Sequence, residues 1–202
     1  MTFLILAAIV LSSCFAADHP FFESRHVAAD DRLVGEYRDA ETGTVTTVAA
    51  TRTRGRYRVI LQENGARSVY VATHFRAGNR TFLDLAAEPV DPVLPPDAEA
   101  PVTQVVRRLL GGGRHVVLRV QATPQQLLVW SPTALSINAL LAREPALVPR
   151  IEHQVLRVFP ASSAQLHAML ERQAQDDALF SQELVLIKSA PTRRTPSRPS
   201  QR

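Results

Sequence analysis

The sequence predicts an α+β fold, in which a mainly antiparallel β meander closes into a barrel-like sheet and two to three short helices follow in the C-terminal half. Three observations predict this fold. Short runs of alternating apolar and polar residues recur along the chain, tight glycine turns join them, and leucines at helical spacing begin only after Ser131. We count eight or nine strands, and a sheet of that size tends to close because closure removes its edges.

The strongest local signal is the pair Asn64-Gly65, which separates two β-rich runs at residues 56–62 and 67–76. A type I′ hairpin turn needs positive φ at both central residues, and Asn-Gly tolerates it. Apolar side chains alternate within both runs, which is typical of an antiparallel sheet with one face on a core. The other strands expected in this meander are residues 33–38, 45–53 and 80–85.

The second half of the chain mixes strands with helices. Five prolines between residues 88 and 101 exclude a central strand or a helix interior there, so we expect a surface loop. Ser162 and Gln165 form a capping-box pattern that predicts a helix to about Gln175. The remaining elements that we expect are strands at 115–121, 126–130, 152–159 and 183–188, a helix after Ser131, and a helical turn at 176–180.

The chain without its tail, residues 1–188, includes the predicted single domain at 32–188 and carries no net charge, with 19 basic and 19 acidic side chains. The chain has 23 basic and 19 acidic side chains, a net charge of +4, and four of the arginines lie in the last fourteen residues, which contain no acid. A nucleic-acid-binding domain needs a basic patch on its folded surface, so we expect no nucleic-acid partner. The tail at 189–202 is rich in Pro, Ser, Thr and Arg and is predicted to be disordered.

The N-terminus carries a nine-residue apolar run at residues 3–11, too short for a membrane-spanning helix, which needs about 20 residues. It fits the hydrophobic region of a secretory signal peptide. The sequence Leu11-Ser12-Ser13-Cys14 that follows resembles the lipobox of bacterial lipoproteins, in which the cysteine receives a diacylglyceryl thioether and becomes the mature N-terminus. This resemblance implies a signal peptide at 1–13 and lipidation of Cys14. Residues 14–31 are mixed and polar, with His19 and Arg25, and are interpreted as a lipid-anchored tether in which Phe21-Phe22 would dock on the body.

The same resemblance implies a location in the bacterial cell envelope. Phe15 is not the Asp that retains lipoproteins at the inner membrane, so the periplasmic face of the outer membrane is expected in a diderm. Met1-Thr2 lacks the basic residue usual in signal peptides. Two alternatives stay open at this point: cleavage after Ala16 or Ala17, which would give a soluble secreted protein, and a buried N-terminal helix.

Gly35-Glu36-Tyr37, on the first expected strand, is similar to the Gly-x-Trp motif of lipocalin-like barrels. The resemblance covers residues 33–130, and the helices expected after Ser131 depart from a simple eight-strand barrel. The run Phe82-Leu-Asp-Leu85 before a leucine-rich C-terminal half also resembles small bacterial envelope proteins of unknown activity.

Four residues on the predicted strands are candidates for ligand binding: Tyr70, His74, Asp84 and His115. Asp84 stands between large apolar neighbours, where it would face a semi-polar lumen that raises its pKa or accept from loop N–H groups. Otherwise it would face solvent or pair with an arginine such as Arg119. The two histidines would otherwise be hydrogen-bonded or outward-facing. No histidine pair has the spacing of helical metal ligands, and no catalytic or phosphate-loop motif is present, so we expect no cofactor and no metal.

These observations predict a non-catalytic, lipid-anchored envelope protein that binds a small apolar ligand at the barrel mouth. The alternative is an envelope scaffold with a filled barrel that binds a protein partner. An enzyme is the third hypothesis, and it would require His74, His115 and Asp84 to converge in one pocket.

Overall fold

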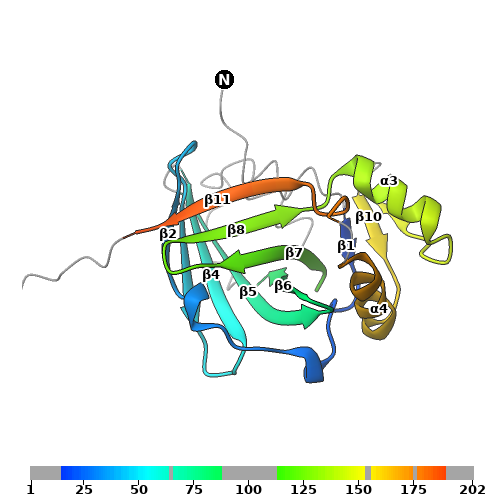
Figure 1. Cartoon of the computed structure of the whole chain (residues 1–202), viewed down its shortest axis with the longest axis horizontal. Helices are drawn as coiled ribbons and strands as arrows, with labels where there is room; N and C mark the ends of the chain where they lie inside the picture. Colours follow the sequence, from blue (N-terminus) through cyan, green and yellow to red (C-terminus); the bar gives the residue numbers. More distant parts are fainter. Residues whose placement is uncertain (1–14, 64–65, 88–112, 153–155, 175–176, 190–202) are drawn as a thin grey trace, which may run out of the picture.

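Eight antiparallel strands close into a barrel in the computed structural model, which describes residues 15–63, 66–87, 113–152, 156–174 and 177–189 (Figure 1). The barrel strands are β2 (Gly35–Asp39), β3 (Val45–Ala50), β4 (Arg56–Glu63), β5 (Ala66–Ala77), β6 (Arg80–Ala87), β7 (His115–Ala122), β8 (Gln126–Ser131) and β11 (Gln182–Lys188). Each strand from β2 to β8 pairs with the next, and β11 closes the ring by pairing with β8 and β2. The predicted fold class is therefore confirmed, and the barrel is consistent with a lipocalin-like architecture.

The hairpin predicted around residues 64–65 is present. β4 and β5 pair antiparallel with Glu63 opposite Ala66, while the two turn residues themselves lie outside the described part of the chain. The expected signal peptide, the proline-rich loop at 88–101 and residues 190–202 of the tail also lie outside it.

An insertion between β8 and β11 packs against one side of the barrel (Figure 1). It consists of α3 (Ala134–Arg143), β9 (Arg150–Glu152), β10 (Leu156–Phe159) and α4 (Ser163–Gln173). α4 begins at the predicted capping box, and a second box formed by Thr133 and Ser136 begins α3. The single strand predicted at 152–159 is wrong, because β9 and β10 are two strands that pair antiparallel. The sequence between them has no glycine or proline to signal a turn.

The tether expected at 14–31 is also wrong from Phe15 onwards. Residues 15–17 form strand β1 (Phe15–Ala17), which pairs in parallel with β10 and meets β7 at His115. All three residues are buried, and so is Phe21. The segment then continues through two short 3-10 helices, η1 (Ser24–His26) and η2 (Asp31–Leu33). The folded body therefore includes residues that their mixed composition suggested were a linker.

Two separate apolar clusters stabilise the molecule. The first lines the inside of the barrel and includes Val59, Leu83 and Leu118 from three different strands. The second lies outside the barrel wall, where Phe75 and Phe82 of β5 and β6 are covered by β1, α3 and α4. Adjacent residues of one strand, such as Phe82 and Leu83, thus belong to different clusters, because successive side chains point to opposite faces.

Residues 27–34 cover one end of the barrel. The Tyr57 hydroxyl accepts from the Asp30 backbone N–H at 2.7 Å and donates to the Asp30 carbonyl at 3.1 Å. The Tyr37 hydroxyl donates to the Leu33 carbonyl at 3.0 Å, and burial raises the pKa of Tyr37 to about 12, so it remains a donor at neutral pH. Leu33 belongs to the inner cluster. These contacts define the covered end of the barrel.

We predict that Gly55→Ala destabilises the protein more than Gly43→Ala. Both glycines have φ of +72°, so each substitution carries a similar backbone cost of about 1–2 kcal/mol. A Cβ at Gly55 would come 2.5 Å from Val27 Cγ1 and 2.9 Å from the Ala28 carbonyl oxygen. A Cβ at Gly43 would meet no atom of the surrounding residues within 4 Å. The additional cost at Gly55 should be about 1–3 kcal/mol. Urea unfolding of both variants measures it, and equal losses would mean that the covering segment does not pack as described.

Candidate functional site

The inside of the barrel is the largest continuous apolar surface that the strands share. Its lining consists of aliphatic side chains and three tyrosines, Tyr37, Tyr57 and Tyr70. Apolar lining with a few polar groups is typical of pockets for small molecules.

On two strands, β4 and β6, burial of the inward side chains decreases away from the covered end. On β4, Tyr57 and Val59 are 3% and 8% exposed, whereas Leu61 is only partly buried. On β6, Leu83 is buried, and Leu85 and Ala87 are partly buried. Both strands run from the covered end towards the opposite one, so their inward side chains are least buried at the end where β4 and β6 finish, which we call the accessible end.

Two hydroxyl groups on the inward faces lack a partner within the described part of the chain. Thr46 follows the alternation of Val48 on β3 and is 4% exposed, and Ser131 follows Val129 on β8 and is fully buried. Neither side-chain oxygen has a hydrogen bond. An unsatisfied buried hydroxyl costs about 1–3 kcal/mol. Both lie towards the accessible end, because β3 begins there and β8 ends there, so they are suited to meet a polar group of a bound ligand.

Tyr70 and His74 face the inside of the barrel, but they do not share an environment. Tyr70 belongs to the inner cluster. His74 lies at the covered end, where its Nδ1 is 2.8 Å from the Ala28 carbonyl oxygen. Because a carbonyl can only accept, Nδ1 carries the proton. Burial lowers the pKa of His74, which favours the neutral ring. His74 therefore holds the covering segment in place.

Asp84 faces outward, so of the alternatives considered for it the semi-polar lumen is wrong and acceptance from a backbone N–H is confirmed. Leu83 and Leu85 occupy the inward face of β6, and alternation places Asp84 on the other side. The buried Asp84 carboxylate accepts the Phe21 backbone N–H at 2.8 Å and lies 2.6 Å from His115 Nδ1. It pairs with His115 rather than with an arginine.

The structure thus brings together two of the four predicted candidates, Asp84 and His115. The carboxylate fixes the orientation of the imidazole, as in catalytic pairs, and the His115 side chain keeps 18% of its surface exposed. His74 lies on the opposite face of the wall, so the three residues do not converge in one pocket.

The sequence did not point to a stacked histidine pair beneath the N-terminal segment. The rings of His26 from η1 and His167 from α4 are parallel within 1°, with their centroids 3.7 Å apart. Burial lowers the pKa of His167, and a charge on His26 lowers it further. The two histidines are far apart in sequence, and no motif around either of them predicts that they meet.

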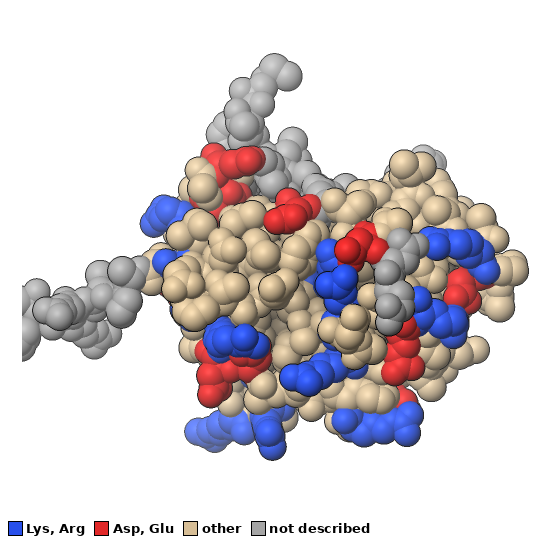
Figure 2. Space-filling model, in the orientation of Figure 1, with Lys and Arg blue, Asp and Glu red and all other residues tan. Residues whose placement is uncertain are grey.

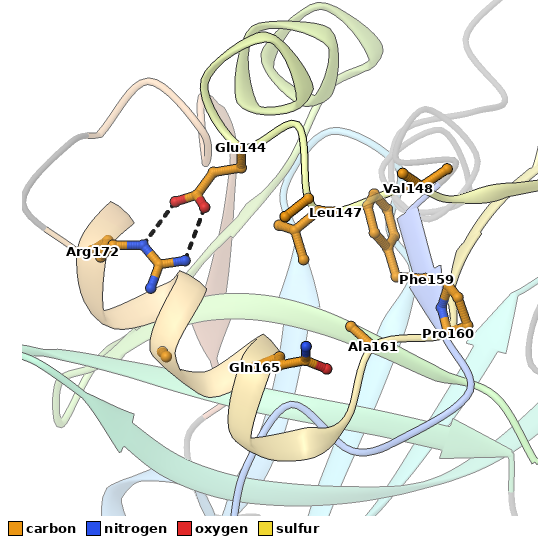
Figure 3. A pocket seen from close by; sticks show the side chains of 10 residues that line it. Glu144, Leu147, Val148, Phe159, Pro160, Ala161, Gln165 and Arg172 are labelled. Carbon is orange, nitrogen blue, oxygen red and sulfur yellow. Dashed lines mark hydrogen bonds and ion pairs between the residues drawn. The ribbon is translucent and has the colours of Figure 1, made fainter.

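A pocket of about 420 Å³ lies between α4 and the segment that follows α3 (Figure 3). Glu144 and Arg172 border one end of it through two hydrogen bonds of 2.7 and 2.9 Å. Val148 and Phe159 lie at the other end, and apolar side chains line most of the space between. This pocket belongs to the insertion and is separate from the barrel lumen.

Neither a metal-binding cluster nor a membrane-spanning helix occurs among the described residues. In these residues no group of three or more His, Cys, Asp and Glu side chains is placed to hold a metal ion. None of the helices described is both long and apolar enough to cross a membrane. On the face shown in Figure 2, basic and acidic side chains are interspersed rather than gathered into one patch.

Comparisons of the chain with protein-family models, with curated proteins and with solved structures found no match.

We predict that the protein loses stability in mild acid because of His167. The folded state lowers the pKa of this residue, so the unfolded chain binds more protons, and the free energy of unfolding falls as the pH drops through and below about 6.5. The neighbouring charged groups are Glu171, 3.5 Å from His167 Nε2, and Glu23 and Arg25 beside His26. His167→Phe should weaken this pH dependence in urea unfolding at pH 7.5 and 5.5.

The matched control is His19→Gln, because His19 is exposed. It should retain the pH dependence of the unchanged protein. A His167→Phe protein that retained it equally would contradict the assignment to the stacked pair.

Proposed function

We propose that this protein is a lipid-anchored cell-envelope protein whose barrel binds a small amphipathic ligand. One observation carries the binding function: the inside of the barrel is lined by apolar side chains, and two inward-facing hydroxyls have no hydrogen-bond partner among the described residues. The apolar part of the ligand would lie against Val59 and Tyr70, deep in the lumen. Its polar group would lie nearer the accessible end, within reach of Thr46 and Ser131.

The arrangement of the covered end supports this orientation. Residues 27–34 satisfy the tyrosine hydroxyls Tyr37 and Tyr57 with backbone groups, so these polar atoms are already used. Thr46 and Ser131 are therefore the inward-facing polar groups most in need of a partner. Since a buried polar group binds best when a partner satisfies it, a ligand with a carboxylate or hydroxyl head is favoured over a pure hydrocarbon.

Strand β1 supports the lipoprotein hypothesis over the secretory alternative. Cleavage after Ala16 or Ala17 would remove most or all of a strand whose three residues are buried and paired with β10. Cleavage before Cys14 leaves that strand whole. The lipobox resemblance of Leu11 to Cys14 therefore agrees with what the fold needs.

The lumen is tested with the fluorescent fatty acid cis-parinaric acid. Leu61→Trp places a larger ring on the inward face of β4 near the accessible end, and it should weaken saturable binding at least about tenfold, equivalent to about 1.4 kcal/mol. Ile60→Trp, on the outward face of the same strand, is the matched control and should bind like the unchanged protein. Thr46→Val should also weaken binding, while it stabilises the ligand-free protein by about 1 kcal/mol because it removes an unsatisfied hydroxyl.

Saturable binding that Leu61→Trp leaves unchanged would reject the lumen as the site. If the unchanged protein binds no fatty acid or extracted envelope lipid and a protein co-purifies with it, the scaffold hypothesis would replace the proposed function.

The anchor has its own test. When the chain is produced in bacteria, we predict that it incorporates radioactive palmitate and that Cys14→Ser abolishes the incorporation, because Cys14 is the only cysteine in the chain. Labelling that survived in Cys14→Ser, or its absence from the unchanged protein, would exclude the lipoprotein assignment without affecting the lumen experiment.

A further inference from the structure

The most exposed large apolar side chains of the described residues belong to the insertion. Leu135, Val148 and Ile151 are 80%, 70% and 69% exposed, and the next in order, Ile187 and Val185 on β11, are 45% and 38% exposed. Exposed apolar side chains that gather in one region mark surfaces of contact with a partner or a membrane. Val148 and Ile151 are close in sequence: Val148 lies two residues before β9, and Ile151 is the second residue of that strand.

Pairing places Ile151 near the first described residue. Phe15 of β1 is the register partner of Arg157 on β10, and Arg157 is the register partner of Ile151 on β9. Neighbouring strands lie about 4.8 Å apart, so the Cα atoms of Phe15 and Ile151 are about 10 Å apart.

Val148 lies near the same strand. It lines the insertion pocket together with Phe159, as Figure 3 shows. The Phe159 ring packs on Phe15 with their centroids 4.8 Å apart. Val148 and Ile151 therefore form one surface beside the start of β1.

The chain has no spacer between that start and the lipidation residue. Phe15 is 1% exposed and held by strand pairing, so its position is fixed by the body. Consecutive Cα atoms across a trans peptide are 3.8 Å apart, so a group attached to the residue before Phe15 is tied closely to the body. Acyl chains on Cys14 would therefore hold the bilayer against this edge of the domain.

We infer that the surface formed by Val148 and Ile151 contacts the phospholipid bilayer and orients the barrel on it. The inference rests on the proposed lipidation of Cys14. The two apolar side chains enter the headgroup region, as exposed apolar groups of peripheral proteins do. The Arg150 side chain, 55% exposed, lies on the opposite face of β9 from Ile151, because successive side chains of a strand alternate. Its ion pairs with Asp18, at 2.8 Å, and Glu152, at 3.6 Å, hold β9 next to the segment that follows β1.

The test uses the full chain, purified from bacteria in its mature form and reconstituted into vesicles of phosphatidylethanolamine and phosphatidylglycerol. Ile151→Cys is labelled with a nitrobenzoxadiazole dye, and Val185→Cys on the outer face of β11 is the matched control. The thioether on Cys14 leaves the introduced cysteine as the only free thiol. The dye at 151 should emit at shorter wavelength and be quenched by doxyl-labelled lipids, whereas the dye at 185 should show neither effect.

The intact mass of each protein separates the two ways of failing. A protein that carries the diacylglyceryl mass but shows no quenching at position 151 would overturn the membrane-contact surface and leave the anchor in place. A protein without that mass would overturn the anchor and, with it, the inference.

Discussion

The wall formed by β5, β6 and β7 is apolar on both faces, and the rest of the molecule is arranged around this constraint. The inward face, with residues such as Leu83, lines the lumen, and the outward face carries Phe75 and Phe82. An antiparallel sheet can leave one face in water, but this one cannot. The N-terminal segment and the insertion between β8 and β11 both pack on the outward face and cover it.

One buried carboxylate links the cover to the wall. Asp84 interrupts the apolar outward face and would be unstable there without partners, because removing a charge from water costs several kcal/mol unless it is compensated. Phe21 supplies a backbone N–H and His115 supplies an imidazole. A structural role is therefore enough to explain the pair formed by Asp84 and His115. It fixes the N-terminal segment where that segment leaves β1 and runs towards the covered end of the barrel.

The sequence predicted where most strands and helices lie, but it did not predict which side of a strand or helix faces the inside of the barrel. Alternation and the Asn64-Gly65 turn predicted the meander, and the capping box at Ser162 predicted the start of α4, because these signals are local. Whether Asp84 points into the lumen depends on which face of β6 closes inward, and alternation is symmetric between the two choices. The stacked pair of His26 and His167 depends on how α4 docks, which no local pattern encodes.

The N-terminal segment was predicted only in part: the docking of Phe21 and Phe22 on the body is confirmed, but a solvated tether is not present from Phe15 onwards. Its polar residues His19 and Arg25 suggested a solvated tether, yet its few aromatic residues determine its position. Phe15 and Phe21 stack at 5.5 Å within the outer cluster, and Phe22 packs on Phe75 at 5.6 Å. Composition averaged over a segment therefore hides a small number of strong contacts.

The N-terminal segment also ties the two proposed properties of the protein together. Its first residues complete the outer cluster through β1, and residues 27–34 cover the end of the lumen. A protease that cut within this segment would expose both apolar clusters, so the place of cleavage is constrained by the fold. Cleavage before Cys14 is compatible with that constraint, and it brings any lipid on Cys14 directly against the folded body. If Cys14 is acylated, closeness to the membrane is then a consequence of how the barrel is closed, because the residues that cover the barrel leave no length of chain for a spacer.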